Sequence, residues 1–160
     1  MTPKILDDLV RDVRTATKDM ACGCGCCERD GEVPKEPIPG WTLLGAGRSR
    51  ATYVYARRGR ESRIVVKVPL GQYGEQCNQS ELTNRRFGYG SLKPEKLARC
   101  RLVWVHSVPV IVMTRVTPLR TPYRTDANYA YDPVPDWAYS LDAEQCGTTP
   151  RGRIVAFDYA

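Results

Sequence analysis

Apolar and polar residues alternate along the chain in a pattern that predicts a small antiparallel sheet. Five apolar segments of strand length are bounded by turn residues, at 41–44, 52–55, 64–68, 101–106 and 109–113. Between the third and the fourth, residues 71–88 have a helical composition at their centre and end at Gly88, a helix stop signal. The pattern therefore predicts three strands, one helix and two further strands, in that order.

The N-terminal segment has a different periodicity. Leu6, Leu9, Val10 and Val13 recur at the spacing of one helix face, so residues 2–20 are expected to form a single amphipathic helix. The pattern favours packing of this face on the protein's own domain, and docking on another protein is the alternative.

The C-terminal part of the sequence is less regular. Residues 117–135 are rich in Pro, Tyr and Asp, which favours irregular structure, and a short helix is expected to begin at Pro135. Residues 151–153 form a turn signal before a last apolar strand at 154–157, so a final β-hairpin is expected.

The composition indicates a soluble globular protein. The 160 residues are 42% hydrophobic and 26% charged, and no apolar run approaches the length of a membrane span. Two aspartates interrupt the N-terminal segment where a signal peptide would be apolar, so an intracellular location is expected. The net charge of +6 suits anionic partners, but it is an ordinary value. His106, the single histidine, falls in the fourth predicted strand and is interpreted as structural.

Four of the seven cysteines are clustered, at Cys22, Cys24, Cys26 and Cys27. Structural zinc sites space their cysteine pairs more widely, and a second pair usually lies far along the chain, so the cluster does not favour zinc. A soft-metal or redox-sensitive loop and an inert linker are the interpretations left open.

The candidate chemistry begins with two glycines and a lysine. Gly45 and Gly47 follow the first predicted strand, and Lys67 lies among β-branched residues in the third. An ammonium group in an apolar strand is costly unless an anion meets it, so Lys67 is expected to have an acidic or phosphate partner.

This order of strands, with a glycine hairpin and a lysine in the third strand, resembles the N-lobe of the protein-kinase-like superfamily. In its small size the chain resembles the kinase-like proteins (pseudokinases) that bacteriophages encode. The resemblance implies that Gly45 and Gly47 fold over the phosphates of ATP while Lys67 binds them. It also implies that Glu81, from the following helix, pairs with Lys67, and that Met113 lines the adenine pocket.

Several positions depart from the kinase pattern. Arg50 stands where kinases usually have a third glycine; an arginine there can reach a phosphate, although the backbone approaches it less closely. The resemblance places Asp158 and Gln145 as ligands of Mg²⁺, with Gln145 replacing the usual Asn. Ser140 occupies the position of the catalytic Asp. The nearest carboxylates are Asp142, two residues later, and Asp136, four residues earlier, and Asp142 is the candidate base.

The resemblance also implies a domain organisation. We expect an amphipathic helix at 1–21, a cysteine cluster and Pro-rich linker at 22–40, and a kinase-like domain at 41–160. Within that domain, residues 41–116 resemble an N-lobe, and 117–160 form a much reduced C-terminal portion without a helical C-lobe. The expected fold class is α+β, a five-stranded antiparallel sheet with one helix after the third strand and an N-terminal helix.

The resulting functional hypothesis is a degenerate kinase-like domain that binds nucleotide and acts through a protein partner. The alternatives are a scaffold without nucleotide, such as a virion or host-directed protein, and a small active phosphotransferase that uses Asp142. A nucleic-acid binder is less favoured; it would use the arginines near the first hairpins, Arg48, Arg50, Arg57, Arg58, Arg60 and Arg63.

Overall fold

The structure is a computed structural model that describes residues 3–18, 37–57, 59–119, 134–141 and 145–158. Its main sheet is antiparallel with the strand order β1-β2-β3-β5-β4. The bounds of these strands are Trp41–Ala46 for β1, Arg50–Arg57 for β2, Arg60–Pro69 for β3, Cys100–Val105 for β4 and Val108–Thr114 for β5. The predicted α+β class and the order of these five strands are thus confirmed.

The remaining elements of the described residues are two α-helices, two short 3₁₀ helices and a second small sheet. Their bounds are Pro3–Lys18 for α1, Gln72–Phe87 for α2, Pro94–Lys96 for η1, Asp136–Ser140 for η2, Thr117–Pro118 for β6, Cys146–Thr148 for β7 and Ile154–Ala156 for β8. The helix α2 follows the third strand, as predicted. It ends at Gly88, whose φ of 102° suits glycine and whose Cβ position would lie 2.5 Å from the carbonyl oxygen of Leu92.

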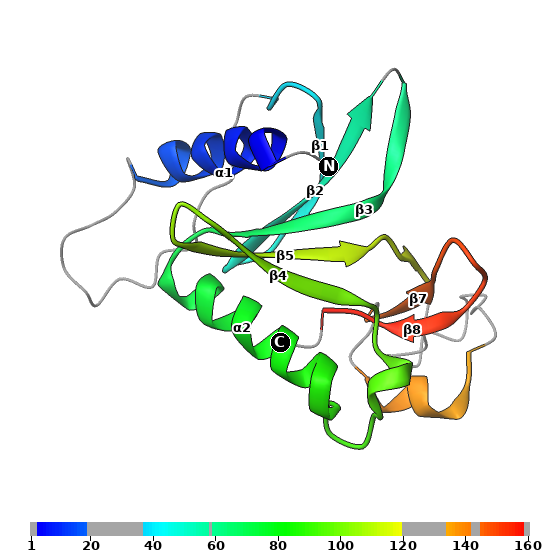
Figure 1. Ribbon diagram of the computed structural model, residues 1–160. Helices are drawn as coiled ribbons and strands as arrows, with labels where there is room; N and C mark the ends of the chain where they lie inside the picture. The colour runs from blue at the N-terminus through cyan, green and yellow to red at the C-terminus, as the bar shows by residue number, and fades with distance from the viewer. Residues whose placement is uncertain (1–2, 19–36, 58, 120–133, 142–144, 159–160) are drawn as a thin grey trace.

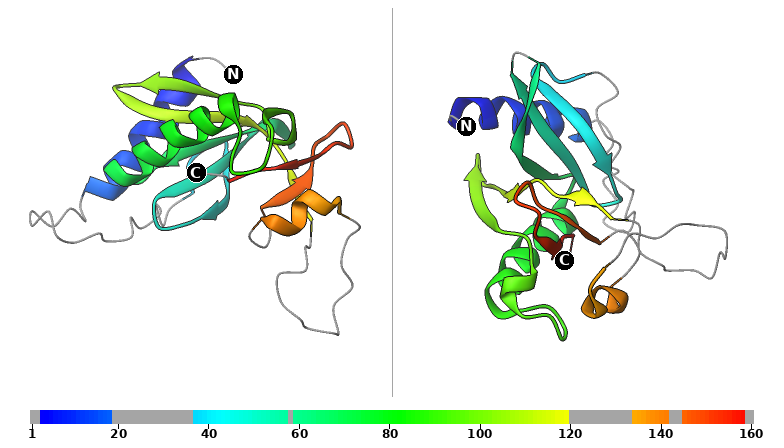
Figure 2. Two further views of the ribbon diagram at one scale, coloured as in Figure 1. Left: turned by 90° about the horizontal axis from the view of Figure 1, so that it is seen from below. Right: turned by 90° about the vertical axis from the view of Figure 1, so that its right-hand side faces the viewer.

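The two long helices cover opposite faces of the main sheet. Figure 1 shows α1 above the sheet and α2 below it, and the side view in Figure 2 shows the same separation. The small sheet β6-β7-β8 lies on the same side as α2, beside the end of β5. The main sheet therefore separates two cores.

The first core lies between α1 and the sheet. The predicted apolar face of α1 is buried, and Leu9 is completely inaccessible to solvent. The apolar face of α1 packs against residues of β2, β3, β4 and β5 that point to this side of the sheet, among them Tyr53, Val66 and Val110. The favoured interpretation of this helix, packing on its own domain, is therefore confirmed.

The second core lies on the opposite face of the sheet. Val65, Ile111 and Met113 point to this side because successive residues of a strand alternate between faces. They pack with Leu97, which precedes β4, and with Val155 of β8. The small C-terminal sheet is thereby joined to the main sheet through apolar contacts.

Two local expectations need correction, and a third is confirmed. His106 lies one residue beyond β4, in a two-residue turn where both His106 and Ser107 have positive φ, and not inside the strand. Residues 117–135 are not wholly irregular, because their first two residues form β6 and pair with β7. The final β-hairpin is present as β7 and β8, joined through Gly152.

Other expectations are only partly covered by the described residues. The cysteine cluster at 22–27 and most of the segment 117–135 lie outside them. Ile38, which belongs to the predicted linker, is buried in the first core. No helix in the described parts of the chain is both long and apolar enough to cross a membrane.

Candidate functional site

The candidate site begins with a lysine that the alternation of β3 turns away from α1. Val66 and Val68 belong to the first core, so Lys67 between them points to the face covered by α2. Only 4% of Lys67 is exposed. A buried ammonium group requires anionic or polar partners, and the neighbouring elements must provide them.

Glu81 of α2 is the first of these partners. The Nζ atom of Lys67 donates to both of its carboxylate oxygens, at 2.8 Å from Oε1 and 3.0 Å from Oε2. Glu81 is completely buried. The structure therefore places these two residues in the salt bridge that the kinase resemblance implies.

Arg50, at the start of β2, joins the same carboxylate from the other side. Its Nη1 atom lies 2.5 Å from Oε2 of Glu81, and its Nη2 atom contacts Asp158. Lys67 also donates to Asp158, at 3.1 Å. Two cations and two carboxylates from β2, β3, α2 and the segment after β8 thus form one charge-balanced network.

Asp158 reaches this network through an uncommon backbone conformation. It lies two residues after the end of β8, and its φ is 58°. Among residues other than glycine, Asp and Asn adopt this left-handed region most readily. Burial raises the pKa of the Asp158 carboxyl, but Lys67 and Arg50 outweigh this effect, so the pKa lies below its ordinary value.

Asn78 fixes α2 against the sheet beside the network. Its side-chain amide donates to the carbonyl oxygens of Lys67, at 3.2 Å, and of Pro109, at 2.8 Å. Its Oδ1 atom lies 3.5 Å from Nη1 of Arg50. Asn78 therefore positions α2 relative to Lys67. The sequence does not indicate this role, because nothing in the sequence distinguishes a buried helical asparagine from an exposed one.

A cavity of about 360 Å³ adjoins this network. Four of the predicted site residues line it: Gly45, Lys67, Met113 and Asp158. Its remaining walls come from β1, β2, β3, Phe157 and the segment from the end of β5 through β6. The volume falls in the range of small-molecule binding sites.

The two glycines of the predicted phosphate loop have different positions. Gly45 pairs with Thr52 in the β1–β2 ladder and lines the cavity, and a Cβ atom there would meet no other atom within 4 Å. Gly47 lies in the turn before β2, where its N–H donates to the carbonyl of Arg50. A ligand can therefore approach the backbone closely at Gly45.

The other predicted site residues are less closely associated with the cavity. The carbonyl of Gln145 accepts a hydrogen bond from the N–H of Phe157, which places Gln145 opposite the residue before Asp158. Asp142 lies outside the described residues, and so does the cysteine cluster. Among the described residues, no three His, Cys, Asp or Glu side chains are grouped as a metal site would need.

The donor set fits phosphate better than it fits a metal ion alone. Lys67 and Arg50 are the donors that bind phosphate oxygens in proteins. Glu81 accepts from both of these cations and is not among the described residues of the lining. Asp158 is the only carboxylate of the described lining. One carboxylate suffices for Mg²⁺ only when substrate phosphates supply further ligands.

Comparison with protein-family models, curated proteins and solved structures gave no match to this chain.

The lowered pKa of Asp158 predicts that this carboxylate stabilises the folded protein at neutral pH and that the stabilisation is lost in acid. Because the pKa is lower in the folded protein, the contribution is fully present above the unfolded value, near pH 4, and is lost as pH falls through the folded pKa. We expect Asp158→Asn to be less stable than the wild type at pH 6, and the difference to shrink below about pH 4. Urea denaturation over this pH range measures it.

The matched control is Asp136→Asn, which removes an exposed carboxylate on η2. Its unfolding free energy should follow that of the wild type across the whole range. Parallel curves for Asp158→Asn and the wild type down to pH 3 would contradict the role assigned to Asp158.

Proposed function

We propose that this protein is a degenerate kinase-like (pseudokinase) domain that binds a nucleotide, with ATP as the first candidate, and acts through a protein partner inside the cell. The observation that carries the proposal is the convergence of Lys67, Glu81 and Asp158 beside the cavity of about 360 Å³. These residues come from three separate elements. The kinase resemblance assigns Lys67 and Glu81 to nucleotide binding and Asp158 to the Mg²⁺ that accompanies the nucleotide.

In this proposal the phosphates compete with Asp158 for its two cations. The Lys67 ammonium group makes three hydrogen bonds, two to Glu81 and one to Asp158. Glu81 is buried and remains in place, whereas the side chain of Asp158 is 52% exposed and can move. An entering phosphate would therefore displace Asp158 and bind Lys67 and Arg50.

Arg50 changes the expected need for a metal ion. It places a second permanent positive charge beside Lys67, at a position where the kinase pattern has glycine. Mg²⁺, if it accompanies the nucleotide, would be bound by Asp158 and Gln145 and would neutralise phosphate charge. We propose that Arg50 supplies part of that neutralisation, so that nucleotide binding depends only weakly on Mg²⁺.

The adenine base would bind at the end of β5, beyond Met113. The N–H groups of Thr114 and Arg115 already donate to the carbonyls of Arg99 and Arg63, at 2.9 Å each. The base would therefore use the backbone of Val116, which lines the same cavity, because Thr117 and Pro118 are paired with β7.

A partner-binding role is supported by the exposed aromatic side chains. Tyr73 and Phe87 on α2 and Trp104 on β4 are 64%, 81% and 61% exposed. Large aromatic residues are enriched where proteins bind one another.

Asp158 is the only carboxylate of the described cavity lining, so the described residues supply no separate base for phosphoryl transfer.

The experiment is a calorimetric titration of ATP into the wild type and Lys67→Met, with and without Mg²⁺. We expect saturable binding to the wild type, and a loss of roughly tenfold or more in affinity for Lys67→Met, because a charged hydrogen bond to phosphate is removed. Lys93→Met is the matched control, because Lys93 is exposed and lies outside the cavity.

Absence of binding to the wild type at millimolar ATP would favour the alternative of a scaffold without nucleotide. That alternative is supported by the complete engagement of Lys67 by its own carboxylates. Equal losses in Lys67→Met and Lys93→Met would likewise contradict a site at Lys67.

A further inference from the structure

A second cavity, of about 410 Å³, lies on the other side of the end of β5. Among the described residues it shares only Thr114 with the cavity beside Lys67, which we call the nucleotide cleft. Arginine is its most frequent lining residue. We call it the arginine pocket, and its five arginines are Arg63, Arg85, Arg99, Arg151 and Arg153.

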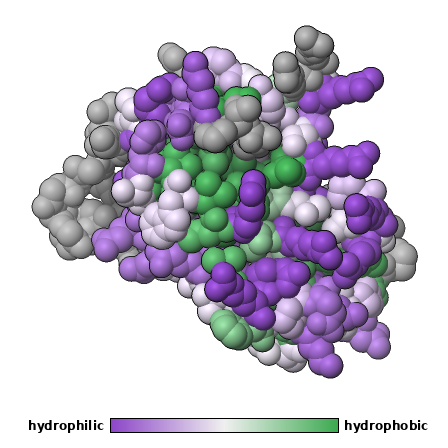
Figure 3. Space-filling model, in the orientation of Figure 1, coloured by the Kyte–Doolittle hydropathy of each residue, from purple (hydrophilic) through white to green (hydrophobic). Residues whose placement is uncertain are grey.

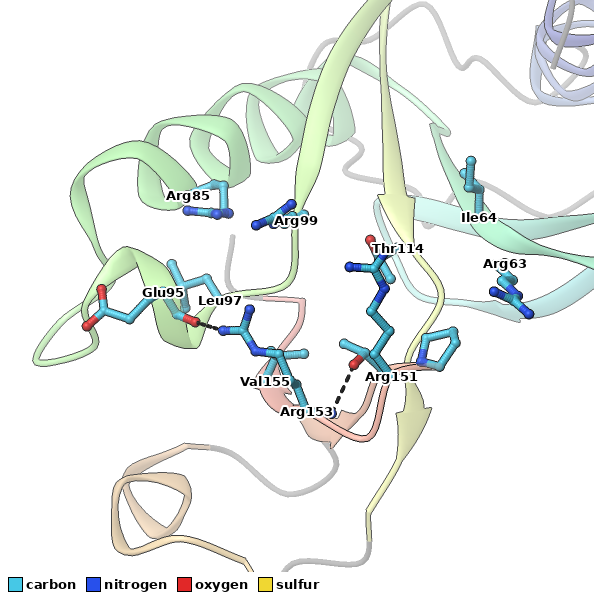
Figure 4. Close-up of a pocket in the computed structure, with 12 residues that line it drawn as sticks. Arg63, Ile64, Arg85, Glu95, Leu97, Arg99, Thr114, Arg151, Arg153 and Val155 are labelled. Atoms are coloured by element: carbon cyan, nitrogen blue, oxygen red, sulfur yellow. Dashed lines mark hydrogen bonds between the residues drawn. The ribbon is translucent and has the colours of Figure 1, made fainter.

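The arginines come from four places that are far apart in the sequence. Arg63 belongs to β3, Arg85 to the last turn of α2, and Arg99 to the segment before β4, while Arg151 and Arg153 belong to the β7–β8 connection. In Figure 4, Arg85 and Arg99 lie on one side of the pocket, Arg153 lies below them, and Arg151 and Arg63 lie toward β5 and β3. The tertiary fold alone brings them together.

These positive charges are not balanced within the pocket. Glu95 is the only acidic residue among the described residues of the lining, and Arg153 donates to its backbone carbonyl, at 2.9 Å, instead of to its carboxylate. Figure 4 shows that carboxylate pointing away from the arginines. Among the described residues, no acidic side chain forms a salt bridge with any of the five.

Other arginines of the chain do have carboxylate partners. Arg14 pairs with Glu75, Arg50 pairs with Glu81, and Arg115 forms a salt bridge with an acidic residue of β3. Like charges that are held together without a counter-charge repel one another. The arginine pocket therefore differs from the rest of the surface in offering several unused guanidinium groups to an external anion.

The positive region continues beyond the pocket. Arg85 and Arg99 also line an adjoining hollow of about 570 Å³, together with Arg86 and Arg101. In Figure 3, hydrophilic side chains are gathered on the lower right of the molecule, the side on which Figure 1 shows β7, β8 and the end of α2. The two hollows share one basic wall.

We propose that the arginine pocket binds a compact ligand that carries several phosphate groups. Guanidinium groups bind phosphate oxygens in pairs, and arginines on facing walls can hold more than one phosphate at once. Leu97 and Val155, both buried, contribute an apolar part of the lining that suits a small organic portion of the ligand. The volume is that of a small-molecule site.

The lining favours such a ligand over a nucleic-acid strand. Proteins that bind single strands stack the bases on aromatic side chains. The described linings of both hollows contain no Phe, Tyr, Trp or His. They also contain no Asn or Gln, the residues that read adenine edges in duplexes. The chemistry is therefore that of phosphate recognition in a concave site.

The test is a calorimetric titration with inorganic tripolyphosphate at physiological salt. We expect the double variant Arg85→Gln/Arg99→Gln to lose roughly tenfold or more in affinity, because two charged hydrogen-bond donors are removed. Arg151→Gln should lose less, in the same direction. The control Arg11→Gln/Arg60→Gln removes the same charge from two exposed positions outside both hollows and should bind as the wild type does.

Three outcomes would overturn the proposal. One is an equal loss in the control and in Arg85→Gln/Arg99→Gln, which would indicate a non-specific charge effect. Another is loss in Lys67→Met with retention in Arg85→Gln/Arg99→Gln, which would place tripolyphosphate in the nucleotide cleft. The third is displacement of tripolyphosphate by a single-stranded oligonucleotide at lower concentration, with a steep salt dependence, which would identify a nucleic-acid surface.

Discussion

Replacing Lys67 by methionine is expected to lower the free energy of unfolding by about 3 kcal/mol, because it leaves the carboxylate of Glu81 buried without its main partner. Glu81 is completely buried and accepts two hydrogen bonds from Lys67. Arg50 still contacts Glu81 in the variant, so the loss should lie near the lower end of the range for broken buried ion pairs. Urea denaturation measures it.

The double variant Lys67→Met/Glu81→Leu distinguishes two contributions to the free energy of unfolding. One is the cost of a buried carboxylate without its partner, and the other is the net contribution of the intact ion pair. Replacing both partners of a buried ion pair by apolar residues is often neutral for stability or stabilising. We therefore expect the double variant to recover most of the stability that Lys67→Met loses. Neither variant should bind ATP as the wild type does, because both lack the lysine.

This pair of results would distinguish a functional lysine from a purely structural one. A double variant as stable as the wild type would mean that the charges are not needed for folding, and their presence would point to a ligand. A double variant less stable than Lys67→Met would contradict this interpretation, because the buried pair would then contribute to stability in its own right.

The second large effect is expected at the first core. Leu9→Ala should lower the free energy of unfolding by about 2–5 kcal/mol, because it removes a fully buried side chain and leaves a cavity between α1 and the sheet. That amount is a large fraction of the stability of an ordinary domain. Chemical denaturation, followed by circular dichroism, is the measurement.

Leu43→Ala provides the comparison for Leu9→Ala. Leu43 lies on β1 and is 43% exposed, so its replacement should change the unfolding free energy by about 0.5 kcal/mol or less. Equal effects of the two substitutions would mean that α1 does not contribute to the core. A loss confined to Leu9→Ala would establish that the N-terminal helix is an integral part of the folded unit.

The regular elements could be predicted because each has a local signal. The apolar spacing of α1 continues through Val13, and Gly88 ends α2 because it adopts a φ of 102°. The boundary of β4 was wrong by one residue for a local reason as well. The turn at His106 and Ser107 adopts positive φ without the Asn and Gly that usually indicate it.

The candidate site was predictable only in part. Lys67 was recognisable because a charged residue interrupts a β-branched strand, and Glu81 because the kinase resemblance requires a glutamate in the following helix. The sequence contains no comparable signal for Asn78 or for the contacts of Arg50 with the two carboxylates. Their roles depend on which residues α2 and β2 face across the second core.

Local sequence patterns were sufficient to predict the order of the strands and α2, the amphipathic character of α1, and the need of Lys67 for an anionic partner. Each of these follows from neighbouring residues, through side-chain alternation, helical spacing or the cost of a buried charge. The contacts by which Arg50 and Asp158 complete the network of Lys67 and Glu81 depend on the packing of distant segments. The same holds for the five arginines of the arginine pocket, which come from four separate segments and meet only when the sheet, α2 and the β7–β8 hairpin have packed.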